Sequence, residues 1–242
     1  MISKTLIKLF FMCAFLLSMF NVNAQDWANL KRYQEENASL TAPSKTDLTA
    51  PSKIEKRVVF MGNSITQGWK EAHPNFFSEN PYLNRGISGQ TTPQMLVRFR
   101  QDVIALQPNV VVILAGTNDI AGNTGPSTLE MIIDNLSSMA ELAHANGIRV
   151  VMCSVLPAYY YPWKKGLEPN IKIPKLNEMI KAYCSKKGFL YLDYFSAMAN
   201  EQNGMIAEYT SDGVHCTAKG YEIMESLVQP AIWKVSKKKS GK

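Results

Sequence analysis

Five residues in four short polar blocks have the types and spacing that serine-based chemistry needs. They are Ser64, Gly89, Asn118 and the closely spaced pair Asp212 and His215. A serine hydroxyl becomes a nucleophile when a base removes its proton, and His215, just before the last expected helix, has the carboxylate of Asp212 three residues earlier. We expect Asp212 to accept a hydrogen bond from one ring nitrogen of His215 while the other ring nitrogen faces Ser64. These three residues form the predicted catalytic set.

A hydrolytic serine also needs hydrogen-bond donors aimed at the oxygen that becomes negative during attack. The predicted donors are the main-chain N–H groups of Ser64 and Gly89 and the side-chain amide of Asn118. Taken singly, each residue has a structural explanation, as a helix-capping serine, a turn glycine and a loop-capping asparagine. Their occurrence after three successive strands favours a shared oxyanion hole.

Short apolar, β-branched runs alternate with longer helical patterns, which is typical of a parallel sheet covered on both faces. The expected strands are residues 57–61, 82–85, 109–114, 149–154 and 190–193. The expected helices are residues 93–106, 127–146, 173–187 and 217–234. Gly147 and Gly188 follow two of these helices as left-handed stops. The pattern predicts one three-layer α/β domain over residues 57–236, with its ligand at the carboxyl ends of the strands, where the polar blocks lie.

Residues 1–24 have the pattern of a cleavable signal peptide. Lys4 and Lys8 precede an apolar run that ends at Phe20, and Ala24 completes a small-residue cleavage pattern. A membrane anchor is the competing interpretation, but the run falls short of the roughly 20 residues that span hydrocarbon. We therefore expect cleavage after Ala24, a secreted or periplasmic protein, and no stable membrane anchor.

Residues 25–56 form a lead-in in which Leu-Thr-Ala-Pro-Ser-Lys occurs twice, at 40–45 and 48–53. The prolines favour an exposed linker; alternatively the segment binds a partner or wraps the domain, with Trp27 and Tyr33 docked on it. Residues 237–242 form a basic tail. Two lysines of the leader and four of the tail account for the whole net charge of +6, so no nucleic-acid-binding groove is expected.

The cysteines show no metal-binding pattern. Cys153, Cys184 and Cys216 remain after cleavage, so at most one disulfide can form, and the first two are expected to be small buried side chains. No pair has the spacing of a zinc knuckle, and the adjacent His215 and Cys216 are poorly placed to bind one ion. The sequence predicts neither a metal nor another cofactor, and it does not specify an oligomeric state.

The four blocks resemble those of the SGNH hydrolases, also called the GDSL esterase family, including its platelet-activating-factor acetylhydrolase-like branch. The resemblance covers residues 58–232, with blocks at 62–66, 84–92, 116–119 and 212–215. It implies a flavodoxin-like, five-stranded sheet of order 2-1-3-4-5, a carboxylic ester hydrolase activity and no metal. It also implies a nucleophile at Ser64, an acid and base at Asp212 and His215, and oxyanion donors at Gly89 and Asn118.

Three positions refine the resemblance. The oxyanion glycine falls at Gly89 rather than Gly86. Asn63 and Gln90 stand where the family often has aspartate. Asn63 keeps a hydrogen-bonding side chain without the charge, so we expect support of the loop to persist while the local electrostatics change. Neither position belongs to the catalytic set.

The resemblance and the leader together favour hydrolysis of short acyl esters, above all acetyl, on a carbohydrate. A variable loop at 155–174 contains aromatic residues that suit stacking on sugar faces, Tyr159, Tyr160, Tyr161 and Trp163. A core or lid role for these aromatics is the alternative. A lysophospholipase or general short-chain lipid esterase is the second candidate activity. An inactive glycan-binding module is the alternative of another class, although such a module is expected to lack Ser64 or His215. The expected partner is a small-molecule or glycan ester.

Overall fold

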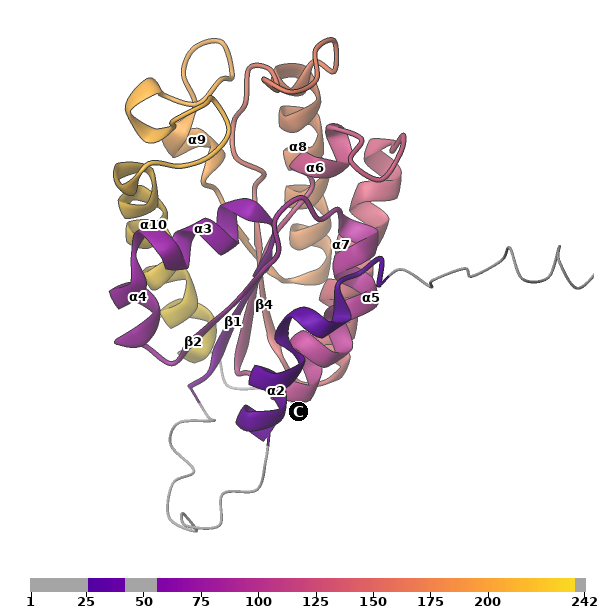
Figure 1. Cartoon of the computed structure of the whole chain (residues 1–242), viewed down its shortest axis with the longest axis vertical. Helices are drawn as coiled ribbons and strands as arrows, with labels where there is room; N and C mark the ends of the chain where they lie inside the picture. Colours follow the sequence, from indigo (N-terminus) through magenta and orange to yellow (C-terminus); the bar gives the residue numbers. More distant parts are fainter. Residues whose placement is uncertain (1–25, 42–55, 238–242) are drawn as a thin grey trace, which may run out of the picture.

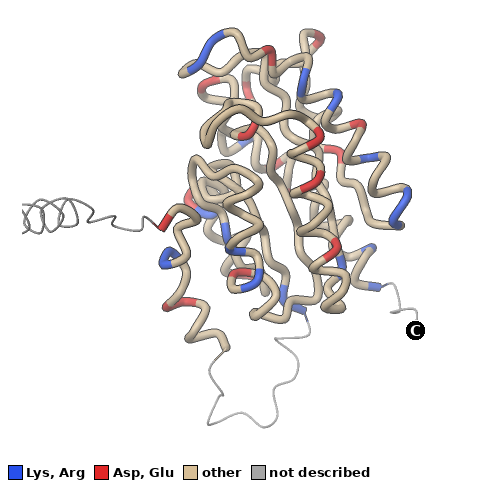
Figure 2. The backbone as a smooth tube through the Cα atoms, turned by 90° about the vertical axis from the view of Figure 1, so that its right-hand side faces the viewer, with Lys and Arg blue, Asp and Glu red and all other residues tan. Residues whose placement is uncertain are grey.

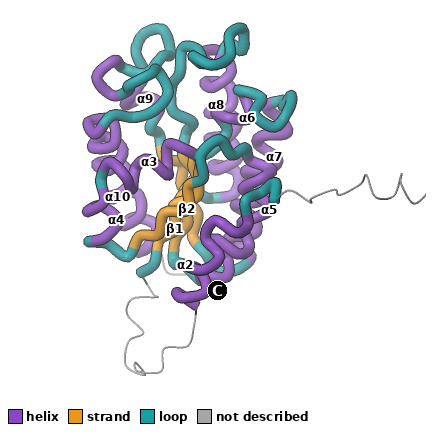
Figure 3. The backbone as a smooth tube through the Cα atoms, viewed as in Figure 1, coloured by secondary structure: helices purple, strands orange, loops and turns teal. Residues whose placement is uncertain are grey.

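The computed structural model describes residues 26–41 and 56–237 of the chain. At its centre lies a sheet of five parallel strands in the order β2-β1-β3-β4-β5 (Figures 1 and 3). The strands are β1 Val58–Gly62, β2 Tyr82–Gly86, β3 Val110–Leu114, β4 Arg149–Cys153 and β5 Leu190–Leu192. Their bounds confirm the expected strands to within one residue, and the strand order confirms the predicted fold class. The leader, most of the repeat and residues 238–242 lie outside the described residues.

The two central strands, β1 and β3, are buried along their whole length. They are rich in valine because β-branched side chains pack well on a pleated surface. Successive side chains point to opposite faces, so Val59 and Met61 enter one hydrophobic core while Val58 and Phe60 enter the other. The continuous apolar runs of these strands therefore result from helices on both sides of the sheet.

Three helices cover the first face: α5 Thr92–Asp102, α7 Leu129–Ala145 and α8 Pro169–Lys187 (Figure 1). The predicted helix at 93–106 is shorter than expected and is followed by a separate 3-10 turn, η2 Ile104–Leu106. Helix α8 begins four residues before its predicted start, because Pro169 occupies the first turn, where its missing N–H is not needed. Gly147 and Gly188 have φ angles of 74° and 73°, which confirms both predicted helix stops.

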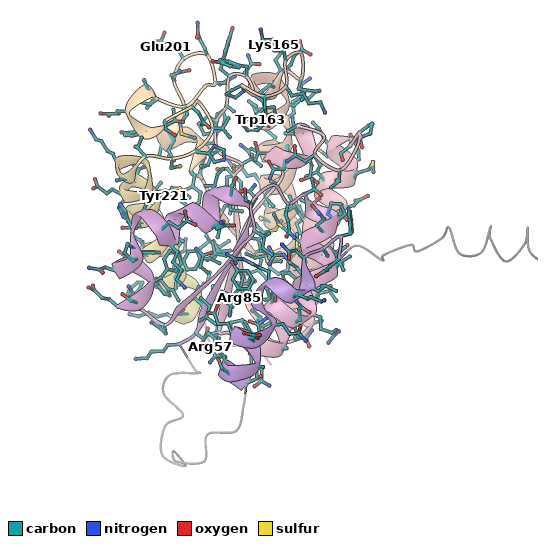
Figure 4. All side chains as sticks on the ribbon, viewed as in Figure 1. Arg57, Arg85, Trp163, Lys165, Glu201 and Tyr221 are labelled. Carbon is teal, nitrogen blue, oxygen red and sulfur yellow. The ribbon has the colours of Figure 1, made fainter. Side chains whose placement is uncertain are left out.

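The second face is covered by α3 Ser64–Ala72, α4 Pro74–Ser78 and α10 Ala218–Lys237. An aromatic cluster fixes α3 on this face. Trp69 stacks between Phe76 and Tyr221, with ring centroids 5.1 and 5.7 Å away, and Phe60 meets its edge. Tyr221, labelled in Figure 4, also donates a hydrogen bond of 2.8 Å to the Ile65 carbonyl. The first turn of α3 is thus anchored to α10. The remaining short helices are α6 Thr117–Ile120, α9 Phe195–Met198 and η3 Ala207–Tyr209.

The described part of the lead-in packs against the domain. It forms the 3-10 turn η1 Leu30–Tyr33 and the helix α2 Gln34–Thr41, which lie beside α5 (indigo in Figure 1). Tyr33 docks on the domain, whereas Trp27 is 49% exposed. At the other end, Lys237, predicted to begin the basic tail, is instead the last residue of α10, and its ammonium lies 3.6 Å from the Trp233 ring centroid.

The described residues agree with the expected roles of the cysteines. Cys153 and Cys184 are buried, and neither they nor Cys216 forms a disulfide. Burial raises the pKa of the Cys184 and Cys216 thiols to about 12. Within residues 26–41 and 56–237, no helix is long and apolar enough to cross a membrane, and no three acidic, histidine or cysteine side chains gather as a metal site. Basic and acidic residues are interspersed along the backbone in Figure 2.

A buried carboxylate joins the start of α5 to α6. Asp119 is 2% exposed and accepts hydrogen bonds from the Thr92 main-chain N–H at 3.0 Å and the Thr92 hydroxyl at 2.6 Å. Burial disfavours the charged form more than these hydrogen bonds favour it, so the pKa of Asp119 is raised from 3.8 to about 6. Asp119 directly follows Asn118 in the sequence, so its hydrogen bonds to Thr92 also hold the backbone of Asn118 near the start of α5.

We predict that the free energy of unfolding falls as pH rises from about 4 to about 6, and that Asp119→Asn removes this component. In that window the carboxyl of the unfolded chain is ionised while that of the folded chain keeps its proton, so raising the pH favours unfolding. The difference between 3.8 and about 6 corresponds to roughly 3 kcal/mol at most. Urea unfolding of both proteins across this range measures the effect. Parallel pH profiles for wild type and variant would contradict it.

Candidate active site

The structure brings Ser64, His215 and Asp212 into one hydrogen-bonded line. The Ser64 hydroxyl lies 3.0 Å from His215 Nε2, although the two residues are 151 positions apart. His215 Nδ1 lies 2.7 Å from Asp212 Oδ2. A base within hydrogen-bonding distance of a hydroxyl, itself oriented by a carboxylate, is the arrangement that activates a serine nucleophile.

Ser64 is the first residue of α3 and lies two residues beyond the end of β1. The preceding Asn63 caps this helix, because its side-chain oxygen accepts a hydrogen bond of 3.0 Å from the Ile65 N–H. Capping by an amide needs no negative charge, so the expected support of this loop by Asn63 is present. Ser64 is half-buried, and its N–H belongs to the first turn of α3, where main-chain N–H groups lack partners within the helix.

Asp212 and His215 lie on a tight turn that holds itself together. Asp212 Oδ1 accepts hydrogen bonds from the main-chain N–H groups of Val214 and His215, at 2.9 and 2.8 Å. Gly213, between them, has a φ of 88°, a conformation that favours glycine. Partial burial acts to raise the pKa of Asp212, but the hydrogen bonds from His215 and Val214 together lower it below its ordinary value. The carboxylate therefore stays ionised at neutral pH and can stabilise a protonated His215.

The predicted oxyanion donors follow three adjacent strands. In the sheet register, Gly62 of β1 lies opposite Gly86 of β2 and Leu114 of β3, so Ser64, Gly89 and Asn118 follow strand ends at the same edge. The side chain of Asn118 is buried and donates one N–H to the Gln90 carbonyl at 2.9 Å. Its amide retains a second N–H for a ligand.

Two glycines of the second block have different structural roles. A Cβ atom at Gly86 would lie 2.2 Å from the Gln67 main-chain nitrogen, so Gly86 permits close packing against α3. Gly89 has a φ of 77°, open space around its missing Cβ, and a carbonyl that accepts from Asn123 at 3.0 Å. This difference is consistent with the assignment of the donor to Gly89, which stays a prediction.

The sequence did not predict the hydrogen bonds of Gln90 with Asn118 and of Asn123 with Gly89 beside the site. It also grouped Trp163 with three tyrosines without predicting where any of these aromatic residues lies. Trp163 is 48% exposed, and its ring centroid lies 6.1 Å from that of His215 (Trp163 is labelled in Figure 4). Tyr161 of the same run is wholly buried and donates its hydroxyl to the Thr117 carbonyl at 3.0 Å. The run therefore contains both predicted alternatives, a core residue and an exposed aromatic beside the site.

The sequence matches the model of the GDSL-like lipase/acylhydrolase family over residues 60–223. The chain belongs to this family. A GDSL-like lipase from Bacteroides thetaiotaomicron, known from a crystal structure, is 49% identical in sequence to this chain. The two structures superpose with a TM-score of 0.79, and the alignment covers 86% of this chain and 98% of that one. Because the family consists of lipases and acylhydrolases, this chain is a carboxylic ester hydrolase.

Two curated relatives have esterase names. An acetylxylan esterase from Xylanibacter ruminicola is 26% identical over 76% of this chain, which spans only 45% of that protein's length. An isoamyl acetate-hydrolyzing esterase 1 homolog from Bos taurus is 28% identical over 74% of this chain and 82% of its own length. Each of these two alignments covers most of this chain.

We predict that Asn118→Ala in this GDSL-family hydrolase lowers kcat by about 10²- to 10³-fold, or roughly 2.7–4 kcal/mol of transition-state stabilisation. The loss falls in kcat because the donor is needed most when the oxygen becomes negative. Steady-state kinetics with p-nitrophenyl acetate measures it. Asn80→Ala is a matched control, since Asn80 also donates one side-chain hydrogen bond to a carbonyl, that of Phe76, at 3.0 Å. An effect of Asn118→Ala confined to KM would show that Asn118 only binds substrate.

Proposed function

We propose that this protein is a secreted or periplasmic serine esterase that removes short acyl groups, chiefly acetyl, from a carbohydrate. The observation that carries the catalytic part is the continuous line from Ser64 through His215 to Asp212, with heavy-atom distances of 3.0 and 2.7 Å. The predicted leader at residues 1–24 supports the location. The alternative of an inactive glycan-binding module is disfavoured because all three side chains are present and aligned.

The reaction proceeds through a covalent acyl-enzyme. Ser64 Oγ attacks the ester carbonyl carbon as His215 Nε2 accepts its proton, and Asp212 stabilises the resulting imidazolium. When the tetrahedral intermediate collapses, His215 gives this proton to the oxygen of the departing alcohol, and the acyl group remains on Ser64. Water, deprotonated by His215, then attacks the acyl carbon, and the acid leaves as the proton returns to Ser64 Oγ. Each proton thus passes through a single nitrogen, Nε2.

The oxyanion formed in both steps is stabilised by three donors. They are the N–H groups of Ser64 and Gly89 and the free N–H of the Asn118 side chain. The Ser64 N–H also lies at the positive end of the α3 dipole, which favours negative charge. These donors are fixed before substrate binds, so little reorganisation is needed as charge develops.

The substrate assignment depends on the surroundings of His215. Trp163 stacks on the buried ring of Tyr161, with centroids 5.4 Å apart and ring planes within 24°. The Tyr161 hydroxyl is hydrogen-bonded to Thr117, so the ring on which the Trp163 indole stacks is fixed in position. Trp163 itself remains 48% exposed. A rigid, exposed aromatic face beside the reacting atoms suits stacking on a sugar ring. The names of the two curated relatives, an acetylxylan esterase and an isoamyl acetate-hydrolyzing esterase homolog, support acetyl as the acyl group.

We predict that a fluorophosphonate probe labels Ser64 in the wild-type protein and labels nothing in Ser64→Ala. The probe reacts only with a serine whose proton can be removed, so labelling also tests the alignment with His215. Mass spectrometry of the labelled peptide identifies the residue. Ser196→Ala is a matched control, because the Ser196 hydroxyl donates to Asp193 at 2.7 Å and has no histidine base. Labelling at another residue, or none with the fold intact, would overturn the nucleophile assignment.

The substrate is tested with p-nitrophenyl acetate, butyrate, octanoate and palmitate, together with an acetylated oligosaccharide. We expect the highest kcat/KM at acetate or butyrate, and release of acetate from the oligosaccharide. Trp163→Ala should lower kcat/KM about tenfold on the oligosaccharide, and by less on p-nitrophenyl acetate, because only the sugar stacks on the indole.

Trp233→Ala is the control for this series, since Trp233 is also exposed but lies on α10, outside the site. Preference for octanoate or longer esters without release of acetate from the sugar would favour the lipid esterase instead. That result would leave the catalytic assignment intact.

A further inference from the structure

The N-terminal segment, residues 26–41, contacts the loop that carries Gly89 at both of its ends. At the beginning of the loop, the Tyr33 hydroxyl donates to the Gly86 carbonyl at 2.5 Å. At its end, the Gln90 side chain donates to the Ala28 carbonyl at 2.7 Å. Gly89 lies between these two anchored positions, so the segment limits the movement of the predicted oxyanion donor from both sides.

The anchor at Gln90 is buried and has little freedom. Gln90 is 3% exposed and Ala28 is 2% exposed. While its amide nitrogen donates to Ala28, the Gln90 side-chain oxygen accepts from Arg98 Nε at 2.6 Å. Arg98 is itself wholly buried. Because both ends of this side chain are bonded inside the protein, movement of the side chain would leave a buried polar group without a partner, which is unfavourable.

The same residue also orients the third predicted donor. The main-chain carbonyl of Gln90 accepts one N–H of the Asn118 side chain at 2.9 Å. This bond sets the rotation of the amide and therefore the direction of its second N–H. Gln90 is thus connected to Gly89 through the chain and to Asn118 through a hydrogen bond, so its position affects two oxyanion donors together.

The segment is held in place by buried charge. Asn37 accepts from Arg85 through two hydrogen bonds of 2.8 and 3.0 Å, and it donates to Asp102 at 2.7 Å. The Arg85 guanidinium lies over the Tyr33 ring, with its Cζ atom 4.6 Å from the ring centroid. Figure 4 labels Arg85 close to the indigo segment. Undocking would leave a buried arginine and a buried aspartate without these partners, so the segment is part of the folded domain.

We infer that Gln90 is a positioning residue for ester hydrolysis, and that the N-terminal segment acts through Gln90 and Tyr33 to hold the oxyanion hole in its working geometry. This inference rests on the proposed function. It assigns a role in the reaction to the described part of the lead-in, which contains none of the catalytic set. A segment that only stabilised the fold would not alter the rate of the folded enzyme.

The test compares Tyr33→Phe and Gln90→Met with wild type in the full chain. Tyr33→Phe removes one hydroxyl and keeps the ring on Arg85, while Gln90→Met removes both side-chain hydrogen bonds at similar size. We expect kcat for p-nitrophenyl acetate to fall about ten- to hundredfold in each, with KM changed less than about twofold, because a misplaced donor is felt mainly in the transition state. Gln101→Met is the matched control, since Gln101 also donates to the segment, at the Leu30 carbonyl, 2.7 Å away.

A double-mutant comparison separates positioning from general stability. In an Asn118→Ala background, Gln90→Met should lower kcat by a smaller factor than it does in the wild-type background, because one of the two donors that Gln90 positions is already gone. Equal losses in both backgrounds, an equal loss in Gln101→Met, or unchanged kcat in folded Tyr33→Phe would each overturn the inference. If Gln90→Met fails to fold, Tyr33→Phe alone decides. A wild-type protein that hydrolyses no ester would contradict the proposed function, whereas an active wild type with fully active variants contradicts this inference only.

Discussion

One buried guanidinium connects the strand ends on which the candidate site is built. Arg98 of α5 has no exposed surface and donates to the carbonyls of Gly62 and Arg85, at 3.1 and 2.8 Å. It also donates to Gln90 at 2.6 Å and to Asp102 at 2.9 Å. Burial lowers the pKa of Arg98, although Asp102 acts in the opposite direction. Removing such a charge from water costs several kcal/mol, so the arrangement is stable only while these four acceptors stay in place.

This constraint fixes the relative positions of the loops that follow β1 and β2. Gly62 is the first residue of the block that contains Ser64, and Arg85 lies one residue before the end of β2, which leads into the loop that contains Gly89. Because one cation binds both carbonyls, the proposed nucleophile Ser64 and the loop that carries Gly89 cannot shift independently. The parallel register, which pairs Gly62 with Gly86, sets the same relation through the sheet. The site therefore depends on a polar contact beneath it as much as on the hydrophobic faces of the sheet.

The sheet and the hydrogen-bonded line of Ser64, His215 and Asp212 could be predicted from the sequence, because both depend on strong local patterns. Valine-rich runs define β1 and β3, and Asp212 and His215 share one short turn. The docking of residues 26–41 could be posed only as an alternative, because it depends on single buried polar contacts, such as that of Asn37 with Arg85, that have no periodic pattern. The short helix α4 was missed for a similar reason, since its stability comes from the aromatic packing of Phe76 and Phe77 rather than from its length.

The two halves of the candidate machinery are supported in different ways. Asp212 and His215 are each 38% exposed in their side chains, and their turn is held by its own hydrogen bonds. The loop that carries Gly89 has one internal main-chain hydrogen bond, from the Gln90 N–H to the Ile87 carbonyl at 3.3 Å. Its other contacts come from Arg98 of α5, from Asn123 and from the N-terminal segment. This division fits the chemistry, because a base must exchange protons with water and alcohol, whereas oxyanion donors are most effective when they are rigid and shielded from solvent. The lead-in residues Ala28 and Tyr33 thus support a loop in which Gly89, having no side chain, makes no side-chain contact of its own.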